Sequence, residues 1–275
     1  GVQTCALPIF GPVIGGFVVD PHRPATFAVV FVADAVPFLA PLAVVLGPIR
    51  HLLATGPATE PVAGPTDADP ADASGSYRSL LADPAQRPLL LLVVVASLIG
   101  FGQLDSGIPA LARSLGDVPT RVVGWGFGLE CAVVAVLQLL VVERLEGRRR
   151  TRVLVCAAAL WGSSFVLLGL TGLSSGTLVA VALFLTCLVA FALGEALYVA
   201  PLMAMINDLA PDHLRGRANS LASLAGQIGY GAGPLLAGTL LGQGRPLALV
   251  TALVVGAALV MALSRSEEHT SELQS

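Results

Sequence analysis

The sequence predicts an all-α integral membrane protein, a bundle of long apolar helices. Hydrophobic residues make up 55% of the 275-residue chain and charged residues only 12%, against about 25% charged residues in an ordinary soluble domain. The mean hydropathy is +0.82. Apolar stretches of about 20 residues, the length that spans a bilayer, recur along the chain. This composition excludes a soluble enzyme and a disordered chain, and the net charge of −3 offers no basic surface for nucleic acid.

The two ends of the chain are set aside from the fold. Residues 1–9 read GVQTCALPI and residues 265–275 read RSEEHTSELQS. We identify both segments as translations of the two strands of one common sequencing-adapter oligonucleotide, so they are expected to be non-native. The native residues, 10–264, are expected to be a fragment of a longer gene. They contain no lysine and much Ala, Gly, Pro and Arg, which is typical of a high-GC bacterial genome.

The apolar segments predict the order of the spans. Residues 10–19 are expected to be the second half of a helix, counted here as helix five. Helices six to twelve follow at residues 25–46, 88–113, 122–142, 153–173, 177–205, 218–241 and 246–263. Residues 10–50 would then end an N-terminal half, and residues 88–264 would form a C-terminal six-helix half. Trp125 and Trp161 are predicted to lie in the interfacial belts at the helix ends.

A polar linker, residues 51–87, separates helix six from helix seven. Its Pro, Ala, Asp, Thr and Gly content is typical of a flexible segment. Residues 76–82 are expected to form a short interfacial helix. The sequence Asp83-Pro84-Ala85-Gln86 predicts the next helix start, because Asp is a good N-cap, Pro suits the first helical position, and Gln can complete a capping box.

The arginines predict the orientation in the membrane. The loops after helices six, eight and ten carry ten arginines: Arg50, Arg78, Arg87, Arg144, Arg148, Arg149, Arg150, Arg152, Arg215 and Arg217. The other loops carry four: Arg23, Arg113, Arg121 and Arg245. Because positive charge accumulates in cytoplasmic loops, the linker is expected on the cytoplasmic side of a bacterial cytoplasmic membrane.

A short internal repeat predicts two related halves. The segment Gly11-Pro12-Val13-Ile14-Gly15-Gly16 recurs as Gly233-Pro234-Leu235-Leu236-Ala237-Gly238, six helices later. Internal repeats of this kind are common in secondary transporters. Gly229, Gly233 and Ala237 fall at four-residue spacing and predict a flat helix face for close packing, while Pro234 can bend its helix. The motif is expected to serve either as pure packing or as a hinge between the halves.

These features resemble the major facilitator superfamily. The segment GPVIGG is similar to the antiporter motif of drug–proton exchangers, and the linker matches the connection between two six-helix halves. Residues 143–150, ERLEGRRR, are similar to the second-half copy of the family's G-x-x-x-D-R-x-G-R-R loop. The leading Gly is absent, Glu143 replaces Asp, and one residue is inserted before Gly147. Residues 208–219, DLAPDHLRGRAN, resemble the family's P-x-x-x-R-G-R segment. The resemblance implies a twelve-helix bundle, of which this chain would hold about seven and a half helices.

The resemblance also selects candidate site residues. In that family the first and fourth helices of each half line the cavity, here the helices that carry Asp105 and Glu195. Asp105 lies about 12 Å from the outer end of its helix, which Arg113 marks, so it is expected near mid-membrane. A carboxyl at that depth is costly and can carry a proton. Glu130 and Tyr198 are further candidates, and the alternative for each residue is a structural hydrogen bond between helices.

The basic loop and the end of helix ten predict a cytoplasmic latch. Arginines would pair with carboxylates or helix C-termini in one transport state and release them in another. The candidates are Arg144, Arg148, Arg149, Asp208, Arg215 and Arg217. The alternative is that these arginines act only as a topology signal.

Proton-coupled efflux of a small amphipathic molecule by alternating access is the function that these features favour. Uptake symport or facilitated diffusion in the same fold is the nearest alternative. The membrane subunit of an ATP-driven importer is another, although the predicted cytoplasmic loops lack an E-A-A…G coupling pattern. The expected partners are lipid, a small-molecule substrate and protons, with no cofactor, metal or nucleic acid. No enzyme activity is expected, because the sequence contains neither an H-E-x-x-H nor a G-x-x-x-x-G-K-[ST] motif, and the isolated fragment is expected to be inactive.

Overall fold

The computed structural model describes residues 23–44, 76–84, 86–144 and 149–273, together with Val18 and Leu46. Within these ranges the chain is helical and contains no strand. The helices are α2 (Pro24–Val44), α5 (Ser76–Ala82), α6 (Gln86–Ile99), α7 (Phe101–Leu104), α8 (Gly107–Gly116), α9 (Thr120–Arg144), α10 (Arg150–Leu170), α11 (Thr177–Leu209), α12 (Arg215–Gly242) and α13 (Pro246–Leu273). Two single 3₁₀ turns, Thr171–Leu173 and Asp212–Leu214, join α10 to α11 and α11 to α12.

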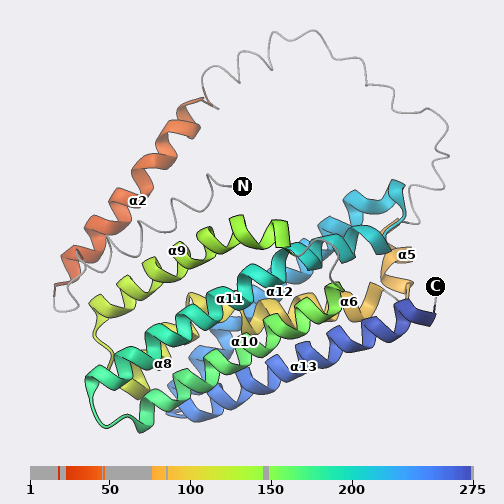
Figure 1. The fold of residues 1–275 in the computed structure, drawn as a ribbon. Coiled ribbons are helices and arrows are strands. Elements are labelled where there is room, and N and C mark those ends of the chain that lie inside the picture. The colour runs from red at the N-terminus through yellow and green to blue at the C-terminus, as the bar shows by residue number, and fades with distance from the viewer. Residues whose placement is uncertain are drawn as a thin grey trace.

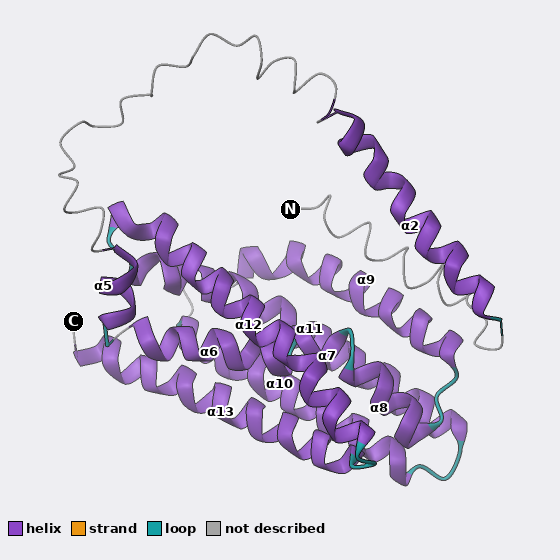
Figure 2. Cartoon of the chain, turned by 180° about the vertical axis from the view of Figure 1, so that it is seen from behind, coloured by secondary structure: helices purple, strands orange, loops and turns teal. Residues whose placement is uncertain are grey.

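Helices α6 to α13 form one antiparallel bundle (Figure 1). Each long helix reverses direction relative to the preceding one because the connections between them are short. The α10 helix packs against α11 and α13, α12 packs against α6 and α7, and α9 packs against α11. The α2 helix stands to one side of this bundle in both views (Figure 2), and most of its described side chains are exposed.

Six of the described helices are long and apolar enough to cross a membrane. They include residues 25–43, 86–104, 120–138, 150–173, 177–209 and 246–266. The α12 helix, predicted as a span over residues 218–241, is not among them, because Gly, Ser, Asn and Gln interrupt its apolar residues. It nevertheless packs along one face against α6, α7 and α11. The predicted fold class, an all-α membrane bundle, is confirmed.

The span predicted as one continuous helix over residues 88–113 is broken twice, so that prediction is wrong in detail. The backbone of Gly100 leaves the helical region with φ −87° and ψ −96°, and Ser106 does so with φ −128° and ψ −65°. Pro109 has no N–H group, so it cannot donate to the carbonyl of Asp105 four residues earlier. The break therefore places Asp105 between two short helices.

Several predicted helix ends agree with the structure, and one does not. The short helix predicted over residues 76–82 is α5. Next to the predicted capping segment, the backbone N–H groups of Gln86 and Arg87 donate to the carbonyl of Asp83. The α13 helix, however, continues past the predicted end at Leu263 to Leu273. Glu and Leu are good helix formers, which explains why the helix extends.

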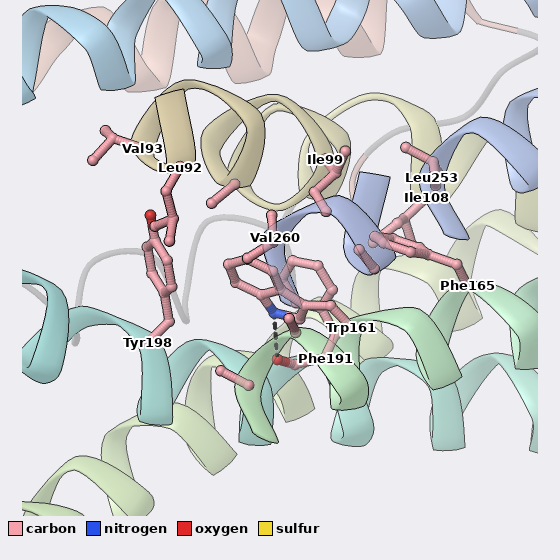
Figure 3. Packing of buried hydrophobic residues seen from close by; sticks show 14 of the residues in the cluster. Leu92, Val93, Ile99, Ile108, Trp161, Phe165, Phe191, Tyr198, Leu253 and Val260 are labelled. Carbon is pink, nitrogen blue, oxygen red and sulfur yellow. Dashed lines mark hydrogen bonds between the residues drawn. The ribbon is translucent and has the colours of Figure 1, made fainter. Parts of the chain in front are cut away.

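An aromatic cluster fills the centre of the bundle (Figure 3). Trp161 on α10 is fully buried and stacks on Phe191, with ring centroids 5.6 Å apart. Its indole N–H donates to the carbonyl of Phe191 at 3.2 Å. Gly194 makes room for the indole, since a Cβ there would lie 2.6 Å from Trp161. The prediction that Trp161 lies in an interfacial belt is wrong, because this residue is near the middle of its helix and packs inward.

Candidate functional site

Two carboxyl groups meet between α9 and α11. Glu130 on α9 is 3% exposed, and its side chain lies in hydrogen-bonding contact with Glu195 on α11. Asp105, in the break between α7 and α8, lies close enough to interact electrostatically with both. The structure therefore brings together the three carboxylates that the sequence singled out on three different helices.

The carboxyl pair is incompletely satisfied. The Oε2 atom of Glu195 is buried and has no hydrogen-bond partner among the described residues. A buried polar atom without a partner is costly, and such atoms are rare in native proteins. This arrangement fits a group that exchanges a proton better than one that only holds two helices together.

Asp105 differs from the other two carboxylates because its side chain is exposed. Its Oδ2 atom accepts a hydrogen bond of 2.7 Å from the hydroxyl of Tyr230 on α12. Sequence reasoning missed Tyr230, because no pattern in the chain relates α12 to the break in the helix that holds Asp105. The bond joins residues 125 positions apart and links α12 to that break.

Two adjoining cavities form a groove between α6, α7, α11 and α12, which we call the α11–α12 groove. Their volumes are about 480 and 420 Å³, and Ser97, Phe101, Ser223 and Gly226 line both. Further lining residues are Gln227 and Tyr230 in the first cavity, and Val93, Tyr198, Val199, Leu202, Met203, Ile206, Asn219 and Ala222 in the second. The walls combine aromatic rings, aliphatic side chains and hydroxyls, which is typical of small-molecule sites.

Tyr198 contributes to both the aromatic cluster and the groove. Its ring lies 5.0 Å from that of Trp161 and 6.2 Å from that of Phe101, measured between centroids. Figure 3 shows the side chain directed from α11 toward Val93 on α6. The hydroxyl is buried and has no hydrogen-bond partner among the described residues. It is therefore an unused polar group at the wall of the groove.

The small-residue face of α12 packs directly on the broken helix. Gly229, Gly233 and Ala237 are all buried. A Cβ on Gly229 would lie 2.2 Å from the carbonyl oxygen of Val94, and one on Gly233 would lie 2.7 Å from Cα of Gly102. The flat face is used for close helix packing, and in the described residues its partner belongs to the same half of the bundle.

Pro234 and Gly238 complete the repeated motif but lie on another face. Pro234 is exposed, and a Cβ on Gly238 would meet nothing within 4 Å. Because Pro234 has no N–H, it leaves the carbonyl of Tyr230 without its usual helical donor. That carbonyl turns toward Gly102, where a Cβ would lie 2.8 Å from it.

Gln103 links α7 to α12 through its side chain. Its side-chain Nε2 donates to the carbonyl of Gly233 at 2.9 Å and to that of Leu98 at 3.2 Å. Gln103 is fully buried, and its Oε1 atom has no hydrogen-bond partner among the described residues. Two of the three residues before the Asp105 carboxylate thus contact α12, Gln103 through its side chain and Gly102 through its backbone.

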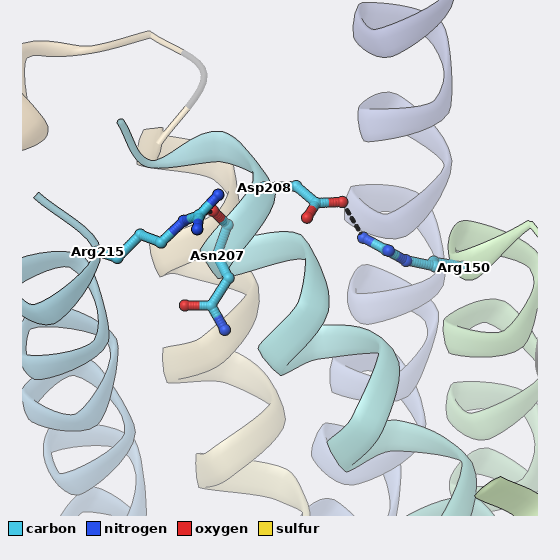
Figure 4. Close-up of polar contacts among 4 residues, drawn as sticks. All are labelled: Arg150, Asn207, Asp208 and Arg215. Atoms are coloured by element: carbon cyan, nitrogen blue, oxygen red, sulfur yellow. Dashed lines mark hydrogen bonds and ion pairs between the residues drawn. The ribbon is translucent and has the colours of Figure 1, made fainter. Parts of the chain in front are cut away.

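The latch candidates are only partly brought together (Figure 4). Asp208, near the end of α11, forms an ion pair with Arg150, the first residue of α10. Arg215 donates from Nε to the carbonyl of Asn207 at 3.1 Å and pairs with Asp212 at 2.8 Å. The loop arginine that meets Asp208 is therefore Arg150, which the candidate set omitted.

For the other latch candidates only the place in the fold can be stated. Arg149 is exposed and precedes α10, with an extended backbone, and Arg217 is half-buried on the first turn of α12. Arg144 is the last residue of α9, and the structure does not describe its side chain. Arg148 lies outside the described residues, as do Gly11, Pro12, Gly15 and Gly16 of the first motif copy.

Comparison with known proteins gives one positive result. Residues 90–275, more than half of the chain, match the family model described as Major Facilitator Superfamily. The matched range contains the three carboxylates, the groove and the small-residue face of α12. No curated protein and no solved structure matches the chain.

Proposed function

Because the chain belongs to the major facilitator superfamily, a family of membrane transporters, we propose that it forms part of a proton-coupled efflux transporter for small amphipathic molecules. The two halves of the complete protein would rock about a central site, opening it to one side of the membrane at a time. The α11–α12 groove would form the part of that site that this chain supplies.

The Glu130–Glu195 pair is the observation that carries the proposal. Two carboxylates in contact at membrane depth repel each other, whereas one shared proton lets a single hydrogen bond replace that repulsion. The pair joins α9 to α11, so a change in its protonation alters the contact between two helices of the bundle. Proton binding is then coupled to helix packing, which is what exchange transport requires.

The α12 face supports a mechanical role for the repeated motif. The backbones of Gly102 and Gly233 are in contact, and Gln103 and Tyr230 tie the same crossing with hydrogen bonds. Smooth glycine faces let helices slide or rock without side-chain collision. In this proposal Pro234 and the adjacent glycines form a hinge, and the Arg150–Asp208 pair belongs to a cytoplasmic latch.

The complete transporter is proposed to extend upstream of Phe10, with the linker on the cytoplasmic side of a bacterial membrane. Sequencing of the source DNA with adapters trimmed tests this directly. An open frame that adds about four and a half apolar helices is expected. A start codon close to Phe10 would contradict the twelve-helix architecture.

Proton coupling is tested in everted membrane vesicles that contain the complete protein. A pH-sensitive dye reports the proton gradient while cationic, neutral and anionic amphiphiles are added in turn. An exchanged substrate is expected to collapse the gradient, and Glu195→Gln or Glu130→Gln is expected to abolish this response. Asp117→Asn, an exposed loop position, is the matched control. A full response in both glutamine variants would exclude the pair as the proton site.

Uptake symport or facilitated diffusion by the same fold is the second candidate. The groove and the family membership fit it equally well, while the antiporter-like GPVIGG segment favours exchange. The sign of the gradient response separates the possibilities: a symporter acidifies the compartment that gains substrate, and a facilitator leaves the gradient unchanged. The importer-subunit alternative is not favoured by the family found.

A further inference from the structure

We propose that the α11–α12 groove binds a singly charged organic cation, with Asp105 as its counter-ion and Tyr230 as the residue that positions Asp105. This inference rests on the proposed function, because it names the substrate class of the same site. In this assignment the exposed carboxylate of Asp105 binds the ligand, and the Glu130–Glu195 pair binds the proton.

In the described bundle, the arginines and three of the carboxyl groups lie at different depths along the helices. Its arginines with described side chains lie near the ends of the bundle: Arg87, Arg149, Arg150, Arg152, Arg215, Arg217 and Arg265 at the linker end, and Arg113, Arg121 and Arg245 at the other. The ionisable carboxyl groups within the middle of α7 to α11 are Asp105, Glu130 and Glu195. Tyr230 connects the groove to one of these carboxylates, Asp105, whereas Arg215 adjoins Asn219 at the opposite, linker end of the groove. The end of the groove next to Asp105 therefore attracts a cation.

Access separates Asp105 from the other two carboxylates. Glu130 is 3% exposed, and Glu195 is half-buried with its Oε2 atom fully buried, so both are less accessible to a large ligand than Asp105. Asp105 is exposed, and Tyr230, which donates to its Oδ2 atom, lines the groove. A carboxylate has about four lone-pair sites, so a cation can bind Asp105 while Tyr230 holds the group in place.

The groove walls suit the rest of such a ligand. Phe101, Tyr198 and Tyr230 present aromatic rings, which attract cations through their faces. Val93, Leu202 and Ile206 supply aliphatic contacts. A hydrophobic body with a single positive charge satisfies all these features, and a neutral or anionic body does not.

Direct binding of matched ions to the purified complete protein tests the inference. Tetraphenylphosphonium and tetraphenylborate have nearly the same size and shape but opposite charge, and ethidium serves as a second cation. Both cations are expected to bind at least tenfold more tightly than the anion. Asp105→Asn is expected to weaken cation binding at least tenfold and Tyr230→Phe about threefold, whereas Asp105→Glu retains it.

Asp117→Asn is the control, because Asp117 is an exposed acidic residue in the loop after α8 with a left-handed backbone that Asn tolerates. It is expected to bind both cations as the unaltered protein does. Equal binding of cation and anion, unchanged cation binding in Asp105→Asn, or no binding of either cation overturns the inference. Loss of proton coupling with Asp105-dependent cation binding intact would instead remove the proposed function and leave this site standing.

Discussion

Gly102 on α7 and Gly233 on α12 lie backbone against backbone, with no side chain between them. A Cβ built on Gly233 would lie 2.7 Å from Cα and 2.9 Å from the carbonyl oxygen of Gly102. Gln103 and Tyr230 also make hydrogen bonds between this part of the chain and α12, to the carbonyl of Gly233 and to Asp105 respectively. The repeated Gly-Pro motif therefore sets how closely α12 approaches the break that holds Asp105.

Gly233→Ala is expected to destabilise the bundle, because the added methyl group collides with backbone that cannot move aside. Overpacking of this kind costs about 1–3 kcal/mol. Gly238→Ala is the matched control four helical positions away from Pro234, since its Cβ would meet nothing within 4 Å. Thermal unfolding of the purified protein in detergent measures both. Equal melting temperatures for the two variants would contradict the close contact.

Gln103→Leu is expected to lower stability by about 1 kcal/mol, because the carbonyls of Gly233 and Leu98 lose a buried donor. Removal of the Oε1 atom, which has no partner among the described residues, offsets part of that loss. Gln227→Leu, an exposed glutamine on α12, controls for the change in polarity. The same thermal measurement checks it, and a larger loss in the control would show that Gln103 does not fasten the crossing.

Much of the fold could be predicted from the sequence, because the length and apolarity of a segment are enough to identify a membrane span. The breaks in helix seven could not be predicted, since hydropathy carries no information about the direction of the backbone. Gly100 and Pro109 were available as signals but are also common in continuous membrane helices. Trp161 was misplaced for a related reason: its depth depends on the small residues that face it, such as Gly194 on α11.

The site was predictable as a set of residue types but not as a set of contacts. Asp105, Glu130 and Glu195 stood out because a carboxyl at membrane depth needs a reason. Their partners depend on how separate helices are rotated about their axes, which a single sequence does not encode in any local pattern. Tyr230 was therefore missed, and the arginine that meets Asp208 was assigned to neighbouring loop positions.

Reversal of one charge in the Arg150–Asp208 pair is expected to reduce transport, and exchange of the two residues is expected to restore it. The pair joins the start of α10 to the end of α11, and both side chains are largely exposed, 44% and 61%. Its effect on stability should therefore stay below about 1 kcal/mol. The local pair Arg215–Asp212 is the control. Vesicle transport by the single, exchanged and control variants measures this, and failure of the exchange would argue against a latch.

Tyr198→Phe is expected to show whether the Tyr198 hydroxyl serves transport or stability. The hydroxyl is buried without a hydrogen-bond partner among the described residues, so its removal should leave thermal stability unchanged or raise it by a few tenths to about 1 kcal/mol. The ring contacts with Trp161 and Phe101 remain, because Phe keeps the aromatic body. If the hydroxyl serves the groove, substrate-induced proton release in vesicles falls severalfold while the protein stays folded. Tyr77→Phe, on the exposed face of α5, controls for the substitution. A clear drop in melting temperature would show instead that the Tyr198 hydroxyl is held by a partner and stabilises the bundle.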